Sequence, residues 1–507
     1  MSGASPESTR ALASEPSVKE MPIGERFFEA LFGFAEGDYV ATRRSLFQNC
    51  TFEAVRANKS SGHNRVRKER ALFHHPRVAG GLPVSSGWHS TPRVADLRTE
   101  TTAAVRTFDE KYPGLLVKLA AARISSCEMS IPPSPVTCVH VAGDAGRMHS
   151  LTVNGVFQVA SQFNLLEFSS SEISPEHGVR HYAHYPTQGP ACALACMAGT
   201  VYRNYLLHPD FFGATDAAAF TENADVADRG QQTDRQLNML DELVDYLTRA
   251  RSSGDATSAT DAAYSAACSA PALPREHFFT IRNGYFFLKR QMASLPARLH
   301  RIAAVEGISM ADVEEELASR LRIGLVEDAT VTLPLHDPPV FRVREQRQLT
   351  DQAERKVVCR LDADVAAEVE VHEVTQTYNS ALSLPSKDYC TPLEWIGIAT
   401  LSRIILRGTY EATLLVGVQH TLRDLERQAS LAVASSPATP PFSLPPIFLT
   451  KVGGGAFNND KEWIASGIAS AVHRVAALRV PLNVRLVHFR RMDEYYMRYF
   501  PSWPVLD

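Results

Sequence analysis

Residues 157–168 read FQVASQFNLLEF, and residues 187–200 read TQGPACALACMAGT. The first stretch begins as an apolar run of strand length, so we predict a strand at 156–162. This strand ends close to two polar side chains, Gln162 and Asn164. We therefore expect a buried strand with hydrogen-bonding groups at its carboxyl end.

The second stretch predicts a short helix of small residues. No charged residue occurs between Thr187 and Tyr202, which favours a helix that is buried on all sides. Proline suits the first helical position because its missing N–H costs nothing there, so we expect Pro190 at that position and Gly189 as the N-cap. The free N–H groups at the start of such a helix favour an anion. The alternative is a tightly packed helix–strand contact without a ligand.

A similar order of strand, glycines and helix occurs near the C-terminus. Residues 446–452 (PIFLTKV) form an apolar run of strand length, and residues 453–460 read GGGAFNND. Apolar residues then recur at helical spacing from Trp463 to Val475, and we expect Asn459 to cap this helix. A tight turn with positive φ needs one glycine, whereas three glycines allow backbone N–H groups to approach a phosphate closely. The pattern therefore favours a ligand-binding loop.

The two stretches together resemble the macrodomain family, over about residues 136–206 and 370–490. The resemblance implies a three-layer α/β/α sandwich with a mixed sheet, in which a Phe-Asn or Ala-Asn strand end holds the distal ribose of ADP-ribose and two glycine-rich loops enclose the diphosphate. The ligand-binding residues that it implies are Asp144 on the adenine, Gln162, Phe163 and Asn164 at the strand end, Gln188, Gly189 and Ala191 in the first loop, and Gly453, Gly454, Gly455, Ala456, Phe457 and Asn458 in the second. Asp144 is equally compatible with a simple turn residue.

Among macrodomains, the closest functional pattern is that of the poly(ADP-ribose) glycohydrolases. Those hydrolases carry a Gln-Glu-Glu triplet at the helix after their glycine-rich loop. This chain has Gly-Pro-Ala-Cys there, so the acidic catalytic residue is absent from the matching position. The other candidates for a catalytic group are His181 and His184, in an aromatic and histidine-rich loop, and Glu411, in an apolar helix. A packed surface loop and, for Glu411, a salt bridge to an arginine are the structural alternatives that we favour.

Composition excludes several classes of protein. A hydrophobic content of 45% with 21% charged residues is typical of a soluble globular protein, and the net charge of −4 provides no field for nonspecific nucleic-acid or membrane binding. No uncharged apolar run reaches the roughly 20 residues that a membrane helix needs. Eight cysteines without a Cys-x-x-Cys pair indicate reduced thiols in the cytoplasm, and we predict neither a metal nor a cofactor.

The length of 507 residues predicts more than one ordinary domain. We expect an α/β organisation with the following parts: a disordered tail at 1–20, a helical and loop extension at 21–135, a macrodomain-like domain at 136–490 with an insertion at about 213–365, and a C-terminal tail at 491–507.

Three local signals in the second half predict particular elements. Asn283-Gly284 predicts the type I′ turn of a β-hairpin. Alternation from 368 to 382 predicts a single strand. The capping box Thr391-Pro392-x-Glu394 begins a helix that we expect to end at Arg407 and to restart after Gly408.

Three functions fit these features. The first is binding of ADP-ribose or a related nucleotide diphosphate, with hydrolysis of an ADP-ribosyl linkage if a titratable group reaches the anomeric carbon. The second is a non-catalytic reader or scaffold for an ADP-ribosylated partner protein. The third is a structural protein that has kept the fold and lost the site. The sequence leaves open the linkage, the role of the insertion and the oligomeric state.

Overall fold

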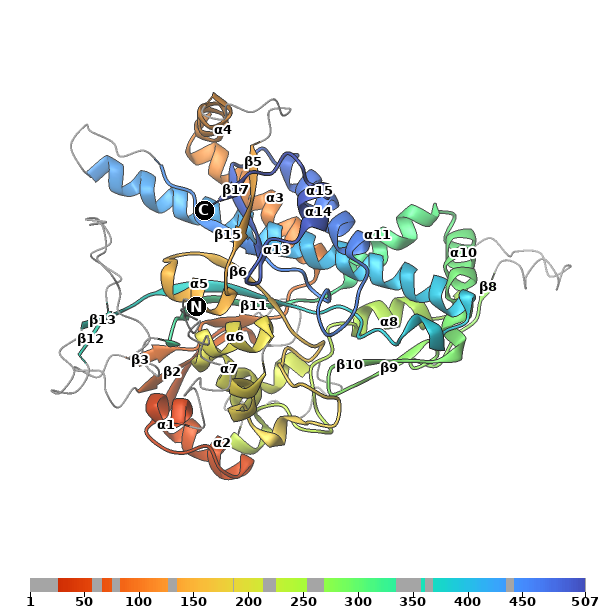
Figure 1. The fold of residues 1–507 in the computed structure, drawn as a ribbon, viewed down its shortest axis with the longest axis horizontal. Helices are drawn as coiled ribbons and strands as arrows, with labels where there is room; N and C mark the ends of the chain where they lie inside the picture. Colours follow the sequence, from red (N-terminus) through yellow and green to blue (C-terminus); the bar gives the residue numbers. More distant parts are fainter. Residues whose placement is uncertain are drawn as a thin grey trace, which may run out of the picture.

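The computed structural model describes residues 26–56, 66–74, 83–125, 135–185, 187–212, 225–252, 269–333, 357–360, 368–434 and 442–506. The tail predicted at 1–20 lies outside these ranges. The chain folds around an 11-stranded mixed sheet with the strand order β1-β2-β4-β11-β14-β6-β15-β16-β5-β17, in which β3 pairs with β2 (Figure 1).

One half of the sheet is antiparallel and the other half is parallel. The antiparallel strands are β1 (Cys50–Arg56), β2 (Val66–His74), β3 (Pro83–Ser85), β4 (Trp88–Ser90) and β11 (Gly324–Thr330). The parallel strands are β14 (Glu373–Asn379), β6 (Val156–Ala160), β15 (Pro446–Leu449), β16 (Leu482–His488), β5 (Val136–Ala142) and β17 (Val505–Leu506). The two halves join where β11 pairs antiparallel with β14.

Three two-stranded pairs lie outside this sheet. They are β7 (Arg251–Ser252) with β8 (Ser269–Ala270), β9 (Phe279–Arg282) with β10 (Tyr285–Leu288), and β12 (Val357–Arg360) with β13 (Glu368–Val371). The hairpin β9–β10 confirms the predicted turn, since Asn283 and Gly284 both have positive φ, at 47° and 77°.

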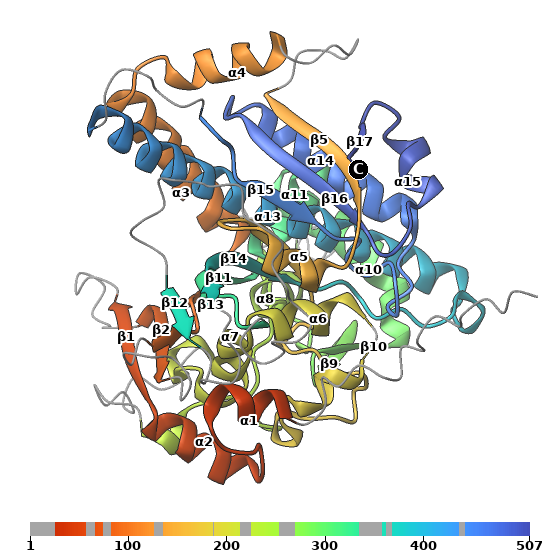
Figure 2. The ribbon, with the colours of Figure 1, turned by 60° about the vertical axis from the view of Figure 1, so that its left-hand side comes forward.

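Helices cover both faces of the parallel strands (Figure 2). On one face α13 (Pro392–Ala434) packs with α3 (Val94–Lys111), α11 (Met310–Arg320) and α14 (Lys461–Ala476), and on the other lie α5 (Ala145–Leu151), α6 (Gln188–Ala195) and α7 (Met197–Val201). Adjacent residues of β6 reach the two layers: Gln158 donates a 3.0 Å hydrogen bond to Thr413 of α13, and Phe157 stacks on His149 of α5. Burial on both faces explains why this strand is an apolar run.

The remaining helices lie around the sheet. They are α1 (Arg26–Phe32), α2 (Tyr39–Gln48), α4 (Leu115–Ser125), α8 (Asp241–Thr248), α10 (Leu295–Glu306), α15 (Glu494–Tyr499), the π-helix η5 (Tyr202–Leu206), and the 3₁₀ helices η3 (Pro175–His177), η4 (Arg180–His184), η6 (Pro209–Phe212), η7 (Val226–Asp228), η8 (Arg290–Ser294) and η9 (Lys387–Tyr389).

Segments outside the predicted core also contribute strands to the main sheet. The extension at 21–135 contributes β1–β4 to the main sheet in addition to its helices, and the insertion contributes β11 next to β14. The tail after residue 490 adds α15 and the edge strand β17, which pairs with β5. Strand pairing between segments far apart in the sequence leaves no local signal, so sequence periodicity alone could not show that these segments join the main sheet.

Four predicted boundaries are corrected. Helix α6 begins at Gln188 with Thr187 as its N-cap, rather than at Pro190, and α14 is capped by Asp460, whose carboxylate accepts a 2.8 Å hydrogen bond from the N–H of Glu462. The strand predicted at 368–382 is two strands, β13 and β14. Helix α13 continues without a break through Gly408, where the missing side chain allows the backbone to approach Ala318 and Leu321 closely.

Candidate functional site

The carboxyl ends of the parallel strands define one edge of the sheet. Four segments begin at this edge: Gly143–Asp144 after β5, Ser161–Asn164 after β6, Ser380 after β14, and Thr450–Phe457 after β15. The side chain of Gln158 ties two of these strands together by accepting a 3.0 Å hydrogen bond from the N–H of Thr450. Ligands of parallel α/β sheets bind at such an edge.

The glycine-rich loop after β15 presents unused backbone donors at this edge. Its segment Gly454–Ala456 is exposed, and within the described residues the N–H groups of Gly455, Ala456 and Phe457 donate to no protein atom. Asn459 fixes the loop from inside, because its amide donates a 2.8 Å hydrogen bond to the carbonyl of Leu382 and contacts the carbonyl of Phe457 at 3.2 Å. Three successive free N–H groups on an anchored loop can bind an anion.

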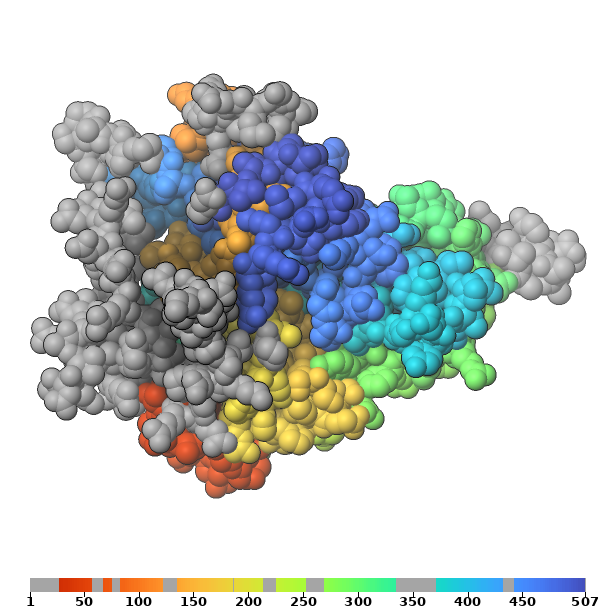
Figure 3. Space-filling model, viewed as in Figure 1, coloured from red at the N-terminus to blue at the C-terminus, as the bar shows by residue number. Residues whose placement is uncertain are grey.

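Helix α6 begins at the same edge and is packed without spare room. A Cβ atom on Gly189 would lie closer than 3.0 Å to the carbonyl oxygen of Ala160, the last residue of β6, and to the carboxylate of Glu167. The first turn of α6 therefore touches the end of β6 directly. In Figure 3 the blue C-terminal segment meets the yellow segment that contains α6 on the surface of the molecule.

Asp144 and Gln188 are hydrogen-bonded to each other, and both also accept hydrogen bonds from backbone N–H groups at the start of α5. The Asp144 carboxylate caps α5 by accepting from the N–H of Arg147 (2.9 Å), and it also accepts from the Gln188 amide (2.9 Å). Gln188 in turn accepts from the N–H of Ala145 at 2.6 Å. The half-buried Asp144 is thus engaged as a helix cap, which is the turn role that the sequence left as an alternative to adenine binding.

The strand-end residues Gln162, Phe163 and Asn164 lie beneath the hairpin β9–β10. The Gln162 amide donates to the carbonyl of Phe168 (2.7 Å) and accepts from its N–H (3.0 Å), which closes the turn at 162–168. Asn164 has no exposed surface: it donates to Gln236 at 2.8 Å and accepts from the N–H of Leu166 at 3.1 Å. A ribose reaches Asn164 only if the hairpin moves, because the hairpin residue Gly284 packs directly on Gln162 and Asn164.

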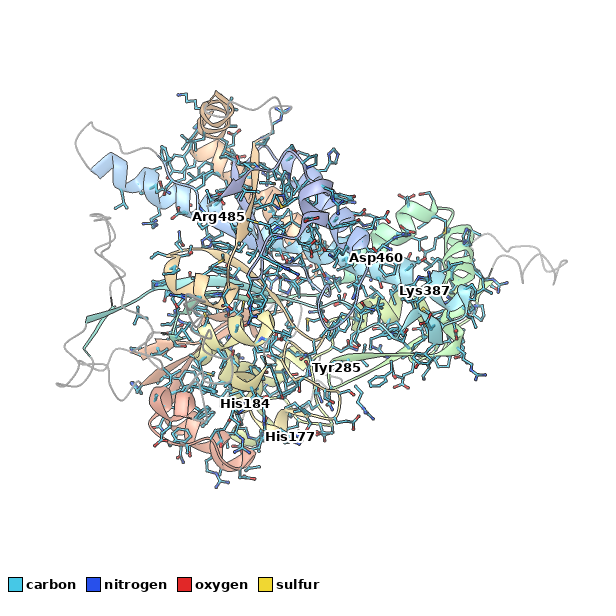
Figure 4. All side chains as sticks on the ribbon, in the orientation of Figure 1. His177, His184, Tyr285, Lys387, Asp460 and Arg485 are labelled. Atoms are coloured by element: carbon cyan, nitrogen blue, oxygen red, sulfur yellow. The ribbon has the colours of Figure 1, made fainter. Side chains whose placement is uncertain are left out.

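The two candidate histidines belong to η4, whose buried residue is instead Tyr182. His184 is exposed and His181 is half-buried, whereas the Tyr182 hydroxyl accepts a 2.8 Å hydrogen bond from the N–H of Glu167. In the view of Figure 4, His184 and His177 lie on one side of Tyr285, and Asp460, which follows the glycine-rich loop, lies on the other. The Tyr182 hydroxyl therefore connects η4 to the turn that follows β6.

Glu411 lies in the helical layer and is paired with arginine, as we favoured from the sequence. Its carboxylate accepts from Arg98 of α3 at 2.6 and 2.8 Å, and Arg474 of α14 lies 3.6 Å away. Its side chain is only 3% exposed. The pairing supports a role in joining α3, α13 and α14.

We expect Arg98→Ala to lower the free energy of unfolding by about 2 kcal/mol, because it leaves the buried Glu411 carboxylate with only the more distant Arg474. Urea denaturation measures this change. Arg106→Ala is the control, since the Arg106–Glu110 pair is exposed and worth less than about 1 kcal/mol. An unchanged stability of Arg98→Ala would contradict the assignment of Glu411 to the helical layer.

Two residues that the sequence analysis did not assign lie at the edge. Glu167 is buried at 3% exposure, and the ring of Tyr285 lies 5.5 Å from that of Phe457 in an edge-on contact. The Tyr285 hydroxyl donates a 2.6 Å hydrogen bond to the carbonyl of Phe168. Glu167 carried a signal in the sequence, as a lone carboxylate in the apolar run LLEF, but the place of Tyr285 depends on how the hairpin folds back.

A surface hollow of about 480 Å³ lies outside this edge. It is lined by Pro274, Arg275, Glu276, His277, Lys289 and Gln291. Its charges are already paired, because Arg275 contacts Asp241 and Asp245 and Lys289 contacts Glu276. None of the predicted site residues lines the hollow, so it does not mark the predicted site.

The fold and the edge define a mixed α/β protein whose mixed sheet carries a glycine-rich loop at the carboxyl ends of its parallel strands. No family model, curated protein or solved structure matches the chain. No helix among the described residues has the length and apolarity that a membrane crossing requires. Among the same described residues, the structure shows no group of three or more His, Cys, Asp or Glu side chains that could hold a metal ion.

Proposed function

We propose that this chain has a macrodomain-like core that binds ADP-ribose or a related nucleotide diphosphate at the carboxyl edge of its parallel strands. The observation that carries the proposal is the run of free N–H groups at Gly455, Ala456 and Phe457, which offers three donors to a diphosphate. An aromatic pair stands beside these donors, since Tyr285 contacts Phe457. Such a ring pair supplies an apolar surface for a ribose or an adenine.

Charge supports a phosphate at this place. Lys451 lies between β15 and the loop and is half-buried, with its ammonium 3.7 Å from Asp493. Burial lowers the pKa of Lys451, although Asp493 partly offsets this effect. A phosphate beside the loop would favour the charged ammonium.

The proposal is tested by calorimetric titration of ADP-ribose, with ADP and NAD as comparison ligands, into the full chain and into Gly455→Val. A Cβ atom on Gly455 has no neighbour within 4 Å, and its φ is not in the left-handed region, so the variant should fold. The added side chain covers the N–H groups that the diphosphate would approach. We expect saturable ADP-ribose binding that Gly455→Val weakens at least about tenfold, or about 1.4 kcal/mol.

Gly37→Val is the matched control. A Cβ atom on Gly37 would also have no neighbour within 4 Å, and Gly37 has no positive φ, but it lies between α1 and α2, away from the proposed site. This variant should bind as the wild type does. Absence of ADP-ribose binding by the wild type, or equal affinities for wild type and Gly455→Val, would sink the proposed site.

A further inference from the structure

A small cavity lies where the two halves of the sheet join. Its walls come from β4, from the start of β11, from η5 and from the turn after β6. Its volume of about 10 Å³ is close to what one water molecule or a single-atom ion needs. Most of the lining is apolar and buried, and includes Leu165, Leu207, Leu237 and Val326. None of the loop residues Gly453–Phe457 lines the cavity, so it is separate from the site proposed for ADP-ribose.

Two polar side chains of the lining each carry an atom without a protein partner. Ser90 Oγ, at the end of β4, and Arg203 Nη1, on η5, are buried and form no hydrogen bond with any described residue. The two side chains are 9% and 1% exposed, so bulk water does not solvate these atoms. A buried donor without an acceptor is costly, above all when it is charged. The two atoms therefore require an acceptor in the cavity.

The protein balances the charge of Arg203 only with neutral groups. Its Nε donates to the carbonyl of Leu165 and its Nη2 to the hydroxyl of Thr200, each at 3.1 Å. The guanidinium also lies 3.6 Å over the ring of Tyr378. Among the described residues, no carboxylate forms an ion pair with Arg203 and none lines the cavity. Arg203 is thus a buried cation without an anionic partner in this part of the chain.

Two buried acids of this region do not supply the missing charge. Burial raises the pKa of Glu167 more than Arg203 lowers it, so this carboxyl group keeps its proton where an exposed glutamate has lost it. Glu69 already has a cation, since Arg229 donates to its carboxylate at 2.7 and 3.0 Å. It also accepts a 2.6 Å hydrogen bond from the Tyr202 hydroxyl.

His89, a titratable side chain of the lining, is neutral. Its Nε2 atom donates to the carbonyl of Ser86 at 3.1 Å. Burial and the neighbouring charge of Arg203 hold the pKa of His89 well below its usual range. Within the described lining, the positive charge therefore belongs to Arg203.

We propose that this cavity binds one chloride ion, which accepts hydrogen bonds from Arg203 Nη1 and Ser90 Oγ. Chloride is a single-atom anion, whereas phosphate, nitrate and carboxylates are too large for about 10 Å³. A water molecule can accept from both donors but leaves the arginine charge unbalanced, and opposite charges attract most strongly in apolar surroundings. The ion joins η5 to β4 at the junction of the two half-sheets. This site goes beyond the proposed function and does not depend on it.

The first test measures thermal unfolding while sodium chloride replaces sodium gluconate at constant ionic strength, which keeps general screening equal. Gluconate is too large for the cavity. We expect the unfolding temperature of wild type to rise saturably with chloride, by about 1 °C or more, because the ion binds only the folded state. Ser90→Ala removes one donor to the ion. It should raise the chloride concentration that gives half of the effect at least about tenfold.

Ser402→Ala is the matched control. Ser402 Oγ is also buried without a partner among the described residues, but it belongs to α13 and does not line the cavity. This variant should respond to chloride as wild type does. Equal unfolding temperatures of wild type in chloride and gluconate would overturn the proposal. An unchanged chloride response in Ser90→Ala would also overturn it, since chloride would then act elsewhere.

The second test needs no variant. Crystals of the full chain soaked in sodium bromide should show an anomalous peak in the cavity, beside Arg203 and Ser90. Density without an anomalous signal at this place would identify a water molecule and overturn the chloride site. ADP-ribose titration reports on the other site, so either proposal can fail while the other stands.

Discussion

Alanine at position 189 is expected to abolish ADP-ribose binding and to lower the free energy of unfolding by about 3 kcal/mol or more. The new Cβ would lie closer than 3.0 Å to the carbonyl oxygen of Ala160 and to the carboxylate of Glu167. The Ala160 oxygen belongs to the backbone at the end of β6, so it cannot rotate away as a flexible side chain can. Helix α6 therefore has to move away from the end of β6, which changes the arrangement of the residues at the carboxyl edge of the sheet.

Urea denaturation and calorimetry measure the two effects of Gly189→Ala. Gly455→Ala is the control for stability, because its Cβ enters open space and should change the free energy of unfolding by less than about 0.5 kcal/mol. A Gly189→Ala protein with wild-type stability and affinity would show that the contact between α6 and β6 is looser than the structure has it.

Glu167→Gln is expected to gain stability relative to wild type as the pH rises. Burial holds the folded-state pKa of Glu167 well above its usual range, so the folded state binds this proton more tightly than the unfolded state does. The stability from that proton is fully present below the unfolded pKa and is lost as pH rises toward the folded pKa, at up to about 1.4 kcal/mol per pH unit. Glutamine has no proton to lose, so the variant escapes this loss.

Glu327→Gln should show the opposite sign. Lys68 and Arg423 outweigh the burial of Glu327 and lower its folded-state pKa, so its carboxylate stabilises the fold above the unfolded pKa and loses that contribution as pH falls through the folded pKa. This variant should therefore be less stable than wild type at pH 8, with a difference that shrinks below about pH 4.5.

Unfolding curves of wild type and both variants from about pH 3 to pH 8 measure both effects. The two glutamates are almost equally buried, at 3% and 4% exposure, so a difference in sign isolates the effect of the ion pair. If the stability advantage of Glu167→Gln does not grow with pH, Glu167 is ionised in the folded protein.

Local sequence patterns predicted several elements of the fold. The apolar run before Gln162, the turn residues Asn283-Gly284 and the helical spacing from Trp463 to Val475 predicted β6, the hairpin and α14. These features depend on neighbours within a few residues, so the sequence states them directly. The same holds for the three glycines, whose lack of side chains is what leaves the loop after β15 open to a ligand.

Pairing between distant segments was not predictable in this way. β11, from the insertion, lies between β4 and β14, and β17, from the C-terminal tail, pairs with β5. Periodicity indicates which face of a strand is buried but not which strand it pairs with. For this reason the sequence did not show that the N-terminal extension, the insertion and the C-terminal tail contribute strands to the main sheet.

The sequence by itself determined which residues form the strand end, the small-residue helix and the glycine-rich loop, because spacing and conformational preference are local. Only the tertiary structure decided which of their groups remain free. Asn164 forms hydrogen bonds with Gln236 and Leu166, and Asp144 forms hydrogen bonds with Arg147 and Gln188. In contrast, the N–H groups of Gly455–Phe457 donate to no atom of the described residues. Tertiary structure likewise left Glu167 buried without a partner, since desolvation depends on what packs around a side chain and not on its neighbours in sequence.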